Sequence, residues 1–205
     1  MPENREIEVK FVLNEPAAMR DKLLQLGAVS HGRCFENNLR LDNDSHTLTE
    51  RHIVLRLRQS EGLNGPSTQL TVKSPAVSSD ASLSFRNEFE LEIGDGATML
   101  AALEVLGYKP YWRYEKHRET FLLGDVEAVI DEVPFGWFLE IEGSPEGIRN
   151  LAKRLDLDLA DGIKHSYVRI FRHVCRTLEI NPGDLTFDAF KDITVDISIL
   201  QKMAG

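Results

Sequence analysis

Short segments of the chain alternate between apolar and charged residues, which is the pattern of a β-strand that buries one face. In the first of them, residues 6–11, Glu6, Glu8 and Lys10 fall on one face and the other face is entirely apolar. Taken alone, this segment predicts an ordinary half-buried strand whose charged face meets solvent. The alternation becomes informative where it recurs.

The same alternation returns in later segments, which are residues 54–58, 70–73, 86–92, 116–118, 130–131 and 140–142. Charges are sorted between them, because residues 54–58 carry arginines on the polar face whereas residues 140–142 carry glutamates. A solvated sheet face usually mixes charges of both signs with Ser, Thr and Gln. Sorted charges therefore indicate side chains that converge on a shared ligand.

The two halves of the chain carry a weak internal repeat. Glu88 follows Glu8 by 80 residues (88 minus 8), and Gly107 follows Gly27 by the same interval (107 minus 27). Each half reads as an acidic strand, a helix that ends in Leu-Gly, and three further strands. Eight antiparallel strands can close into a barrel, which removes exposed sheet edges. The predicted fold class is α+β, a closed eight-stranded antiparallel β-barrel with helices packed outside.

Turn and cap residues predict the remaining element boundaries. The first helix is expected to be capped by Asn14, to begin near Pro16 and to stop at Gly27. Further helices are predicted over residues 97–106, from Ser144-Pro145 onward, and over residues 163–177, and further strands near residues 35–42, 112–122, 125–131 and 136–142. The small polar stretch 74–80 is predicted to be the most mobile loop.

The predicted barrel has a charged interior. The apolar strand faces need the helices as cover, so the charged faces are left to point into the lumen. Filling a small barrel with unpaired like charges would cost several kcal/mol per ion. Such an interior is expected to hold metal ions and an anionic ligand, which neutralise the two sets of charge.

Composition narrows the partners and the compartment. The chain of 205 residues is 42% hydrophobic, as expected for one globular domain, and its net charge of −9 should repel nucleic acid and anionic membranes. Cys34 and Cys175 are too few and too far apart for a disulfide framework or a cysteine-based zinc site. No apolar run approaches the roughly 20 residues of a membrane helix. We expect a cytoplasmic monomer or homodimer whose metal is bound by oxygen ligands.

Seven short motifs, in this order within residues 4–171, resemble those of the triphosphate tunnel metalloenzymes, or CYTH domain family. They are Glu6-x-Glu8-x-Lys10, Leu55-Arg56-Leu57-Arg58, Leu70-Thr71-Val72-Lys73-Ser74-Pro75, Glu88-x-Glu90, Lys116-x-Arg118, Ile130-Asp131 followed by Gly136, and Glu140-x-Glu142. The family includes thiamine triphosphatases, inorganic triphosphatases and class IV adenylyl cyclases. The resemblance implies an eight-stranded tunnel in which cations grip a triphosphate and carboxylates hold one or two Mg or Mn ions.

Side-chain chemistry agrees with these implied roles. Arginine offers bidentate donors to phosphate oxygens and lysine adds point charges, so the predicted substrate-binding residues are Lys10, Arg56, Arg58, Lys73, Lys116 and Arg118. Lys164 joins them because it matches a lysine that similar triphosphatases place over the tunnel mouth. Carboxylates suit Mg and Mn, so the predicted metal ligands are Glu6, Glu8, Glu88, Asp131, Glu140 and Glu142. Lys73 and Arg58 are predicted to be catalytic, by stabilising the transferring phosphoryl group.

Alternatives stay open for several residues. The cations could form cross-strand salt bridges with the acids, and Lys164 could be a surface lysine at a helix start. Glu90 and Glu92 could support the metal site or lie at the rim of the lumen. His117 is expected outside the lumen, and Trp112, Tyr114 and Phe138 are expected to serve packing rather than base stacking.

The predicted function is metal-dependent hydrolysis of a triphosphate within residues 1–177, and residues 178–205 form an extension without an assigned role. The substrate is inorganic tripolyphosphate or a small organic triphosphate such as thiamine triphosphate or a nucleotide. The runner-up is a class IV adenylyl cyclase, in which the ribose 3′-hydroxyl of ATP attacks the α phosphorus. The third possibility is a module that binds triphosphates without turnover. Hydrolysis is favoured because no adenine-specific motif is visible.

Overall fold

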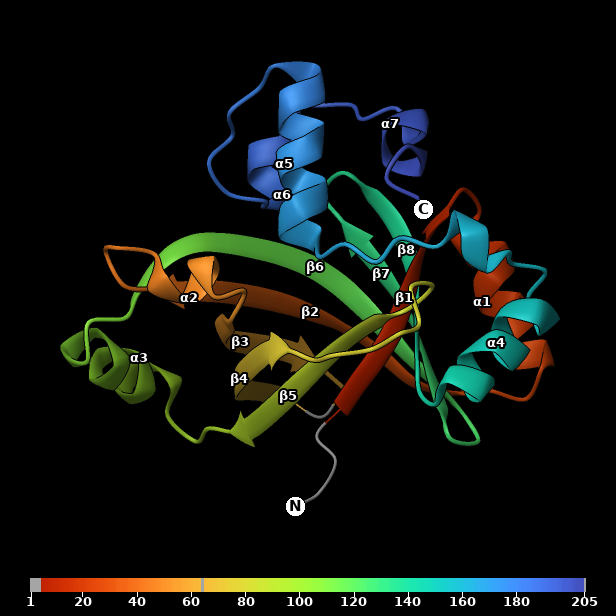
Figure 1. Ribbon diagram of the computed structural model, residues 1–205, viewed down its shortest axis with the longest axis horizontal. Helices are drawn as coiled ribbons and strands as arrows, with labels where there is room; N and C mark the ends of the chain where they lie inside the picture. Colours follow the sequence, from red (N-terminus) through yellow and green to blue (C-terminus); the bar gives the residue numbers. More distant parts are fainter. Residues whose placement is uncertain (1–4, 64, 205) are drawn as a thin grey trace.

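The computed structural model describes residues 5–63 and 65–204, in which eight strands form one closed antiparallel barrel (Figure 1). The strands are β1 (Arg5–Leu13), β2 (Val29–Asp42), β3 (Val54–Gly62), β4 (Gly65–Pro75), β5 (Ser84–Glu92), β6 (Lys109–Leu123), β7 (Val126–Val133) and β8 (Gly136–Glu142). Their order around the barrel is β1-β5-β4-β3-β2-β6-β7-β8. The predicted fold class is confirmed.

Helices surround the barrel in three groups (Figure 1). They are α1 (Pro16–Gln25), α2 (Thr47–Glu50), α3 (Gly96–Val105), α4 (Pro145–Arg154), α5 (Tyr167–Leu178), α6 (Phe187–Phe190) and α7 (Ile197–Gln201). α1 and α4 pack on the outer face of β1, β7 and β8, and α2 and α3 lie against the outer face of β2 and β3. α5, α6 and α7 gather over one end of the barrel, where they share an aromatic-rich core with β6 and β8.

The predicted internal repeat is visible in the order of elements. Each half begins with a strand and a helix, β1 with α1 and β5 with α3, and continues with three strands. Gly27 and Gly107 both adopt φ of +89° directly after the helix ends. Glycine tolerates this left-handed conformation, which terminates a helix, so the repeated Leu-Gly signal has the same structural cause in both halves.

Two predicted helix starts are wrong. α1 has Glu15 at its N-cap and no side-chain cap bond, because Pro16 is the first helical residue and Asn14 lies one position too early. The last predicted helix does not begin at Ile163. The backbone of Ile163 instead pairs with that of Lys10 in β1 through N–H···O bonds of 2.7 and 3.1 Å. The helix α5 starts at Tyr167. The segment before α5 therefore extends the sheet beside β1.

The segment after α5 packs against the barrel and α5. Leu185, Phe190 and Leu200 are buried there. Leu185 also bonds to β6 through its backbone, because its N–H donates to the Arg113 carbonyl at 3.0 Å and its carbonyl accepts from the Glu115 N–H at 2.9 Å. β6 is thus held from outside by residues near the C-terminus.

Neighbouring leucines of α1 test how the helix packs on the barrel. Leu23 is 0% exposed and Leu24 is 38% exposed. We expect Leu23→Ala to lower the free energy of unfolding by about 2–5 kcal/mol, because the lost methyl groups leave a cavity. The matched control, Leu24→Ala, should lower it by less than about 1 kcal/mol. Urea denaturation measures both, and equal losses would contradict this packing.

Candidate active site

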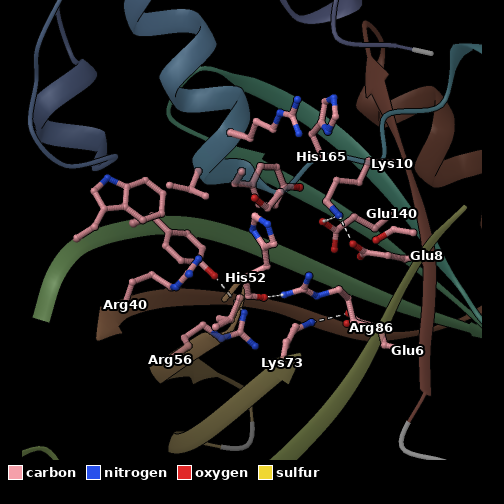
Figure 2. Close-up of a pocket in the computed structure, with 18 of the residues that line it drawn as sticks. Glu6, Glu8, Lys10, Arg40, His52, Arg56, Lys73, Arg86, Glu140 and His165 are labelled. Carbon is pink, nitrogen blue, oxygen red and sulfur yellow. Dashed lines mark hydrogen bonds and ion pairs between the residues drawn. The ribbon is translucent and has the colours of Figure 1, made fainter. Parts of the chain in front are cut away.

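The barrel encloses a charged cavity of about 470 Å³ (Figure 2). Residues predicted from the strand alternation line it, namely Glu6, Glu8, Lys10, Arg56, Arg58, Lys73, Lys116, Arg118, Glu140 and Glu142. Glu88 joins them through a 3.0 Å ion pair with Lys73, and Asp131 lies fully buried behind Arg118. The structure thus brings together the side chains that the sequence predicted to converge, while their roles remain predictions.

Three carboxylates from adjacent strands form one cluster, which we call the acidic cluster: Glu6 on β1, Glu88 on β5 and Glu142 on β8. One oxygen from each lies within 4.8 Å of the others. Burial, followed by the charges of Glu6 and Glu8, raises the pKa of Glu142 to about 8. Burial also raises the pKa of Glu88 to about 7, although Lys73 opposes this change. The cluster is therefore poorly neutralised by the cations around it.

The acidic cluster could hold a metal ion. Oxygen donors at short mutual distances suit hard divalent cations. The Glu6 Oε2 atom is buried and has no hydrogen-bond partner among residues 5–63 and 65–204, while its Oε1 atom accepts from the Lys73 ammonium at 2.5 Å. Burial opposes ionisation of Glu6, but Lys73 and Lys10 outweigh burial and lower its pKa. A cation would complete the coordination that these groups lack.

The other predicted metal ligands lie outside the acidic cluster and contact cations other than Lys73. Asp131 accepts from Arg118 at 2.7 and 2.8 Å, and from Lys116 at 2.9 Å. Arg118 also reaches Glu140 at 2.5 Å. Figure 2 shows Lys10 directed at Glu8 and Glu140, at 2.5 and 3.3 Å. Of the six predicted ligands, Glu6, Glu88 and Glu142 converge with one another, and the remaining three sit in ion pairs.

Cations from β3 and β6 form a second surface of the cavity, which we call the basic wall: Arg56, Arg58 and Lys116. Arg56 donates to the Tyr114 hydroxyl and to the Thr71 hydroxyl, both at 3.0 Å, but its Nε is buried without a partner among the described residues. Arg58 and Lys116 share the Glu36 carboxylate, at 3.3 and 3.5 Å. Arg56 also pairs with Glu90 at 3.4 Å, so each of the six barrel cations that the sequence predicted makes a cross-strand ion pair of the kind considered as an alternative.

Several lining residues were missed by the sequence reading. Glu36, Asn38 and Arg40 alternate along β2, where Arg40 lines the cavity and the buried Glu36 and Asn38 contact Arg58. Tyr114 precedes Lys116 by two residues and so shares its inward face. Both patterns were visible as period-two alternation. By contrast, no sequence signal places the Tyr167 hydroxyl of α5 against Asp131, where it donates at 2.9 Å.

The predictions for the aromatic residues hold in part. Phe138 packs edge-on against Phe135 and Tyr167, as expected for an interior residue. Trp112 and Tyr114 stack on each other, yet both also line the cavity, so packing alone was an incomplete prediction for them.

Two further predictions concern the positions of His117 and Lys164. His117 points outward as expected, with its ring 5.2 Å from the rings of Phe35 and Phe187. Lys164 lines the cavity but does not lie at a helix start. Its ammonium donates to the Ala81 carbonyl at 2.9 Å, in the loop between β4 and β5. Arg149 holds the same loop through Asp80.

This barrel with its charged interior defines a class of protein, and comparison with known families agrees. Residues 4–167 match the model of the CYTH domain. The match spans most of the 205 residues, so the chain belongs to the CYTH domain family. Among the described helices, none combines the length and apolar character needed to cross a membrane.

Three similar proteins are named putative cyclases, and one of them is also described with triphosphatase activity. A Methanocaldococcus jannaschii protein named "putative adenylate cyclase" is 28% identical over 152 residues, which cover 74% of this chain and 83% of that protein. A "putative adenylate cyclase" from Vibrio parahaemolyticus has a TM-score of 0.72 at 22% identity, over 82% of this chain and 97% of that one. A Hippeastrum protein described as a "putative adenylyl cyclase" with "dominant" triphosphatase activity has a TM-score of 0.58 at 21% identity, over 82% and 95%. At these identities the solved structures show the shared fold.

Metal binding should stabilise the protein more as pH rises. The raised pKa values of Glu88, about 7, and Glu142, about 8, mean that the folded protein retains protons that the unfolded chain has lost above pH ~4.5. Their contribution to stability therefore falls as pH rises from about 5 to 8, and a bound cation removes this loss by favouring the ionised carboxylates. We expect the increase in Tm on adding Mg²⁺ or Mn²⁺ to be larger at pH 8 than at pH 6.5. An equal increase at both pH values would contradict it.

The acidic cluster can be tested with a substitution that conserves size. Glu142→Gln removes a charge that a hard cation requires, so we expect Mn²⁺ affinity to fall by about tenfold or more while the fold is retained. Glu92→Gln is the matched control, because Glu92 lies on the exposed end of β5. Isothermal titration of Mn²⁺ into both variants measures the difference. Unchanged affinity in Glu142→Gln would mean that this acid has a structural role.

Proposed function

We propose that the protein hydrolyses a triphosphate in the barrel cavity with the help of Mg²⁺ or Mn²⁺. One observation carries this proposal: the basic wall and the acidic cluster line the same cavity and belong to different strands. Cations are suited to phosphate oxygens, whereas clustered carboxylates are suited to divalent ions. A triphosphate with its metal ions is a ligand that satisfies both.

In this proposal the cations bind the phosphates and the acidic cluster binds the metal. Arg56, Arg58 and Lys116, with Lys10, Arg118 and Lys164 around them, would hold the phosphate oxygens. Glu6, Glu88 and Glu142 would hold the metal, with Glu8 beside them because it pairs with Glu142 across β1 and β8. In this proposal Asp131 and Glu140 orient Arg118 and Lys10 through their ion pairs.

Lys73 is the residue best suited to stabilise the transferring phosphoryl group. Its ammonium lies 2.5 Å from Glu6 and 3.0 Å from Glu88, so it sits beside the acidic cluster. A divalent cation supplies, when bound, charge stabilisation on phosphate oxygens and a lower pKa for the attacking water. Arg58 of the basic wall would then stabilise the phosphates as negative charge moves during the reaction.

An adenylyl cyclase is the second candidate, because all three relatives described above are named putative adenylate or adenylyl cyclases. It would use the same cations and acids, with the ribose 3′-hydroxyl of ATP as nucleophile. The products separate the two reactions. Hydrolysis releases orthophosphate, whereas cyclisation releases cyclic AMP and pyrophosphate.

Product analysis tests the proposed function. We expect orthophosphate from at least one of tripolyphosphate, thiamine triphosphate and ATP when Mg²⁺ or Mn²⁺ is present, and no reaction in EDTA. Cyclic AMP as the main product would replace hydrolysis by the cyclase reaction. Binding without turnover of any of the three would indicate a triphosphate-binding module.

The same assay tests the two predicted catalytic cations. Lys73→Met and Arg58→Met should each lower kcat by about 100-fold or more, because each removes a charge directed at the reacting phosphates. Lys109→Met is the matched control, since Lys109 is exposed and pairs with Asp44 outside the cavity. Thermal unfolding of each variant separates a catalytic loss from a loss of fold. A kcat within about twofold of wild type in both variants would remove these residues from the mechanism.

A further inference from the structure

Tyr114 occupies a position that the predicted ligand set does not use. It lies on β6 with Lys116 and Arg118 on the same inward face, and it lines the cavity although it is only 7% exposed. Tyr114 thus places a phenol hydroxyl on a strand face that otherwise carries cations. Its hydroxyl is a neutral group that can both accept and donate a hydrogen bond.

The Tyr114 hydroxyl accepts a hydrogen bond but does not donate one within the described residues. Its oxygen accepts from the Arg56 Nη1 at 3.0 Å. No acceptor for its own proton is found among residues 5–63 and 65–204 within hydrogen-bond distance. The Glu36 carboxylate is directed at Arg58 and Lys116 instead. The phenolic proton is therefore available to an acceptor that enters the cavity.

The charges around Tyr114 select an anionic acceptor. Burial alone would raise the pKa of Tyr114, but Arg56, Lys116 and Arg58 outweigh burial and lower it to about 8. These three cations are the basic wall. An anion that binds to them comes within reach of the Tyr114 hydroxyl, which lies beside them.

The ring of Tyr114 is held firmly in this position. It stacks on Trp112 with ring centres 5.1 Å apart, and Trp112 packs against Phe171 of α5 at 5.4 Å. On the other side, the backbone on either side of Tyr114 is bonded to Leu185. The Tyr114 side chain is thus already ordered before a ligand binds. Ligand binding therefore does not cost the conformational entropy of fixing this side chain.

We propose that Tyr114 is a direct contact of the phosphate chain, and that its hydroxyl donates a hydrogen bond to a phosphate oxygen held by Arg56 and Arg58. This inference rests on the proposed function, since it assumes that the basic wall binds a triphosphate. It adds a neutral donor to the predicted cations. The hydroxyl loses its proton in alkaline solution and can then no longer donate. Triphosphate binding should therefore weaken as pH rises and Tyr114 becomes ionised.

Binding of tripolyphosphate in EDTA tests the contact without relying on turnover. We expect Tyr114→Phe to weaken the Kd by about tenfold or more at pH 7, because a hydrogen bond to a charged acceptor is lost. Tyr108→Phe is the matched control, since Tyr108 packs with the α2 and α3 cluster outside the barrel. Its Kd should stay within about twofold of wild type. Isothermal titration measures all three proteins.

Tyrosinate absorbance provides a reading that a purely structural role would not change. The chain has four tyrosines, and Tyr114 should titrate first, with a pKa of about 8. Saturating tripolyphosphate should raise this midpoint by about one pH unit or more, because the phosphate accepts a hydrogen bond from the protonated hydroxyl and repels the tyrosinate. Wild-type protein suffices for this titration, so it remains decisive even if Tyr114→Phe does not fold.

The outcomes separate this inference from the proposed function. If tripolyphosphate binds but leaves the tyrosine midpoint unchanged, the Tyr114 contact is wrong and the proposed function stands. If binding shifts the midpoint but no triphosphate is hydrolysed, the contact is supported and the hydrolase assignment fails. If tripolyphosphate binds neither in EDTA nor in the presence of Mg²⁺ or Mn²⁺, both are overturned.

Discussion

Charge balance inside a narrow barrel is the constraint on which the rest of this structure depends. Each buried ion carries a desolvation penalty of several kcal/mol, which is offset only where opposite charges and hydrogen bonds surround it. Asp131 satisfies this condition fully, because Lys116, Arg118 and Tyr167 all donate to it. The acidic cluster satisfies it only in part, because Lys73 contacts Glu6 and Glu88 while the pKa values of Glu88 and Glu142 stay raised. That contrast between a neutralised network and a partly neutralised cluster separates the parts of the lumen that hold the fold from those suited to bind a ligand.

The helices beyond the barrel strands contribute to this balance. Tyr167 begins α5 and lies over Lys10 and Lys116, whose ammonium groups are 5.8 and 5.6 Å from its ring. Its hydroxyl donates to Asp131 in the same position, so one side chain contacts both signs of charge. α5 in turn rests on the segment that contains Leu185 and Phe190. The C-terminal elements thus support the geometry of the cavity from its covered end.

Membership in the CYTH domain family agrees with a cavity that combines both kinds of charge, but it leaves the nucleophile open. A basic wall and an acidic cluster would suit a water molecule or a ribose hydroxyl as nucleophile, because both reactions redistribute negative charge along a triphosphate, although at different phosphorus atoms. Relatives named as cyclases and one described with triphosphatase activity are consistent with this chemical similarity. The features that discriminate between the two reactions are therefore the residues that would contact the organic part of a substrate.

The sequence by itself determined the strands, the repeat and the inward phase of the charges, because a strand alternates its faces with period two and each Leu-Gly ends a helix in the same way. It also identified Glu6, Glu88 and Glu142 as acids of one lumen, but could not separate them from Asp131. Only the tertiary structure decided that, since the partners of a carboxylate come from strands and helices distant in sequence, such as Tyr167 beside Asp131. The start of α5 was decided in the same way: backbone pairing of Ile163 with Lys10 overrides local helical preference because both segments gain hydrogen bonds that neither has alone.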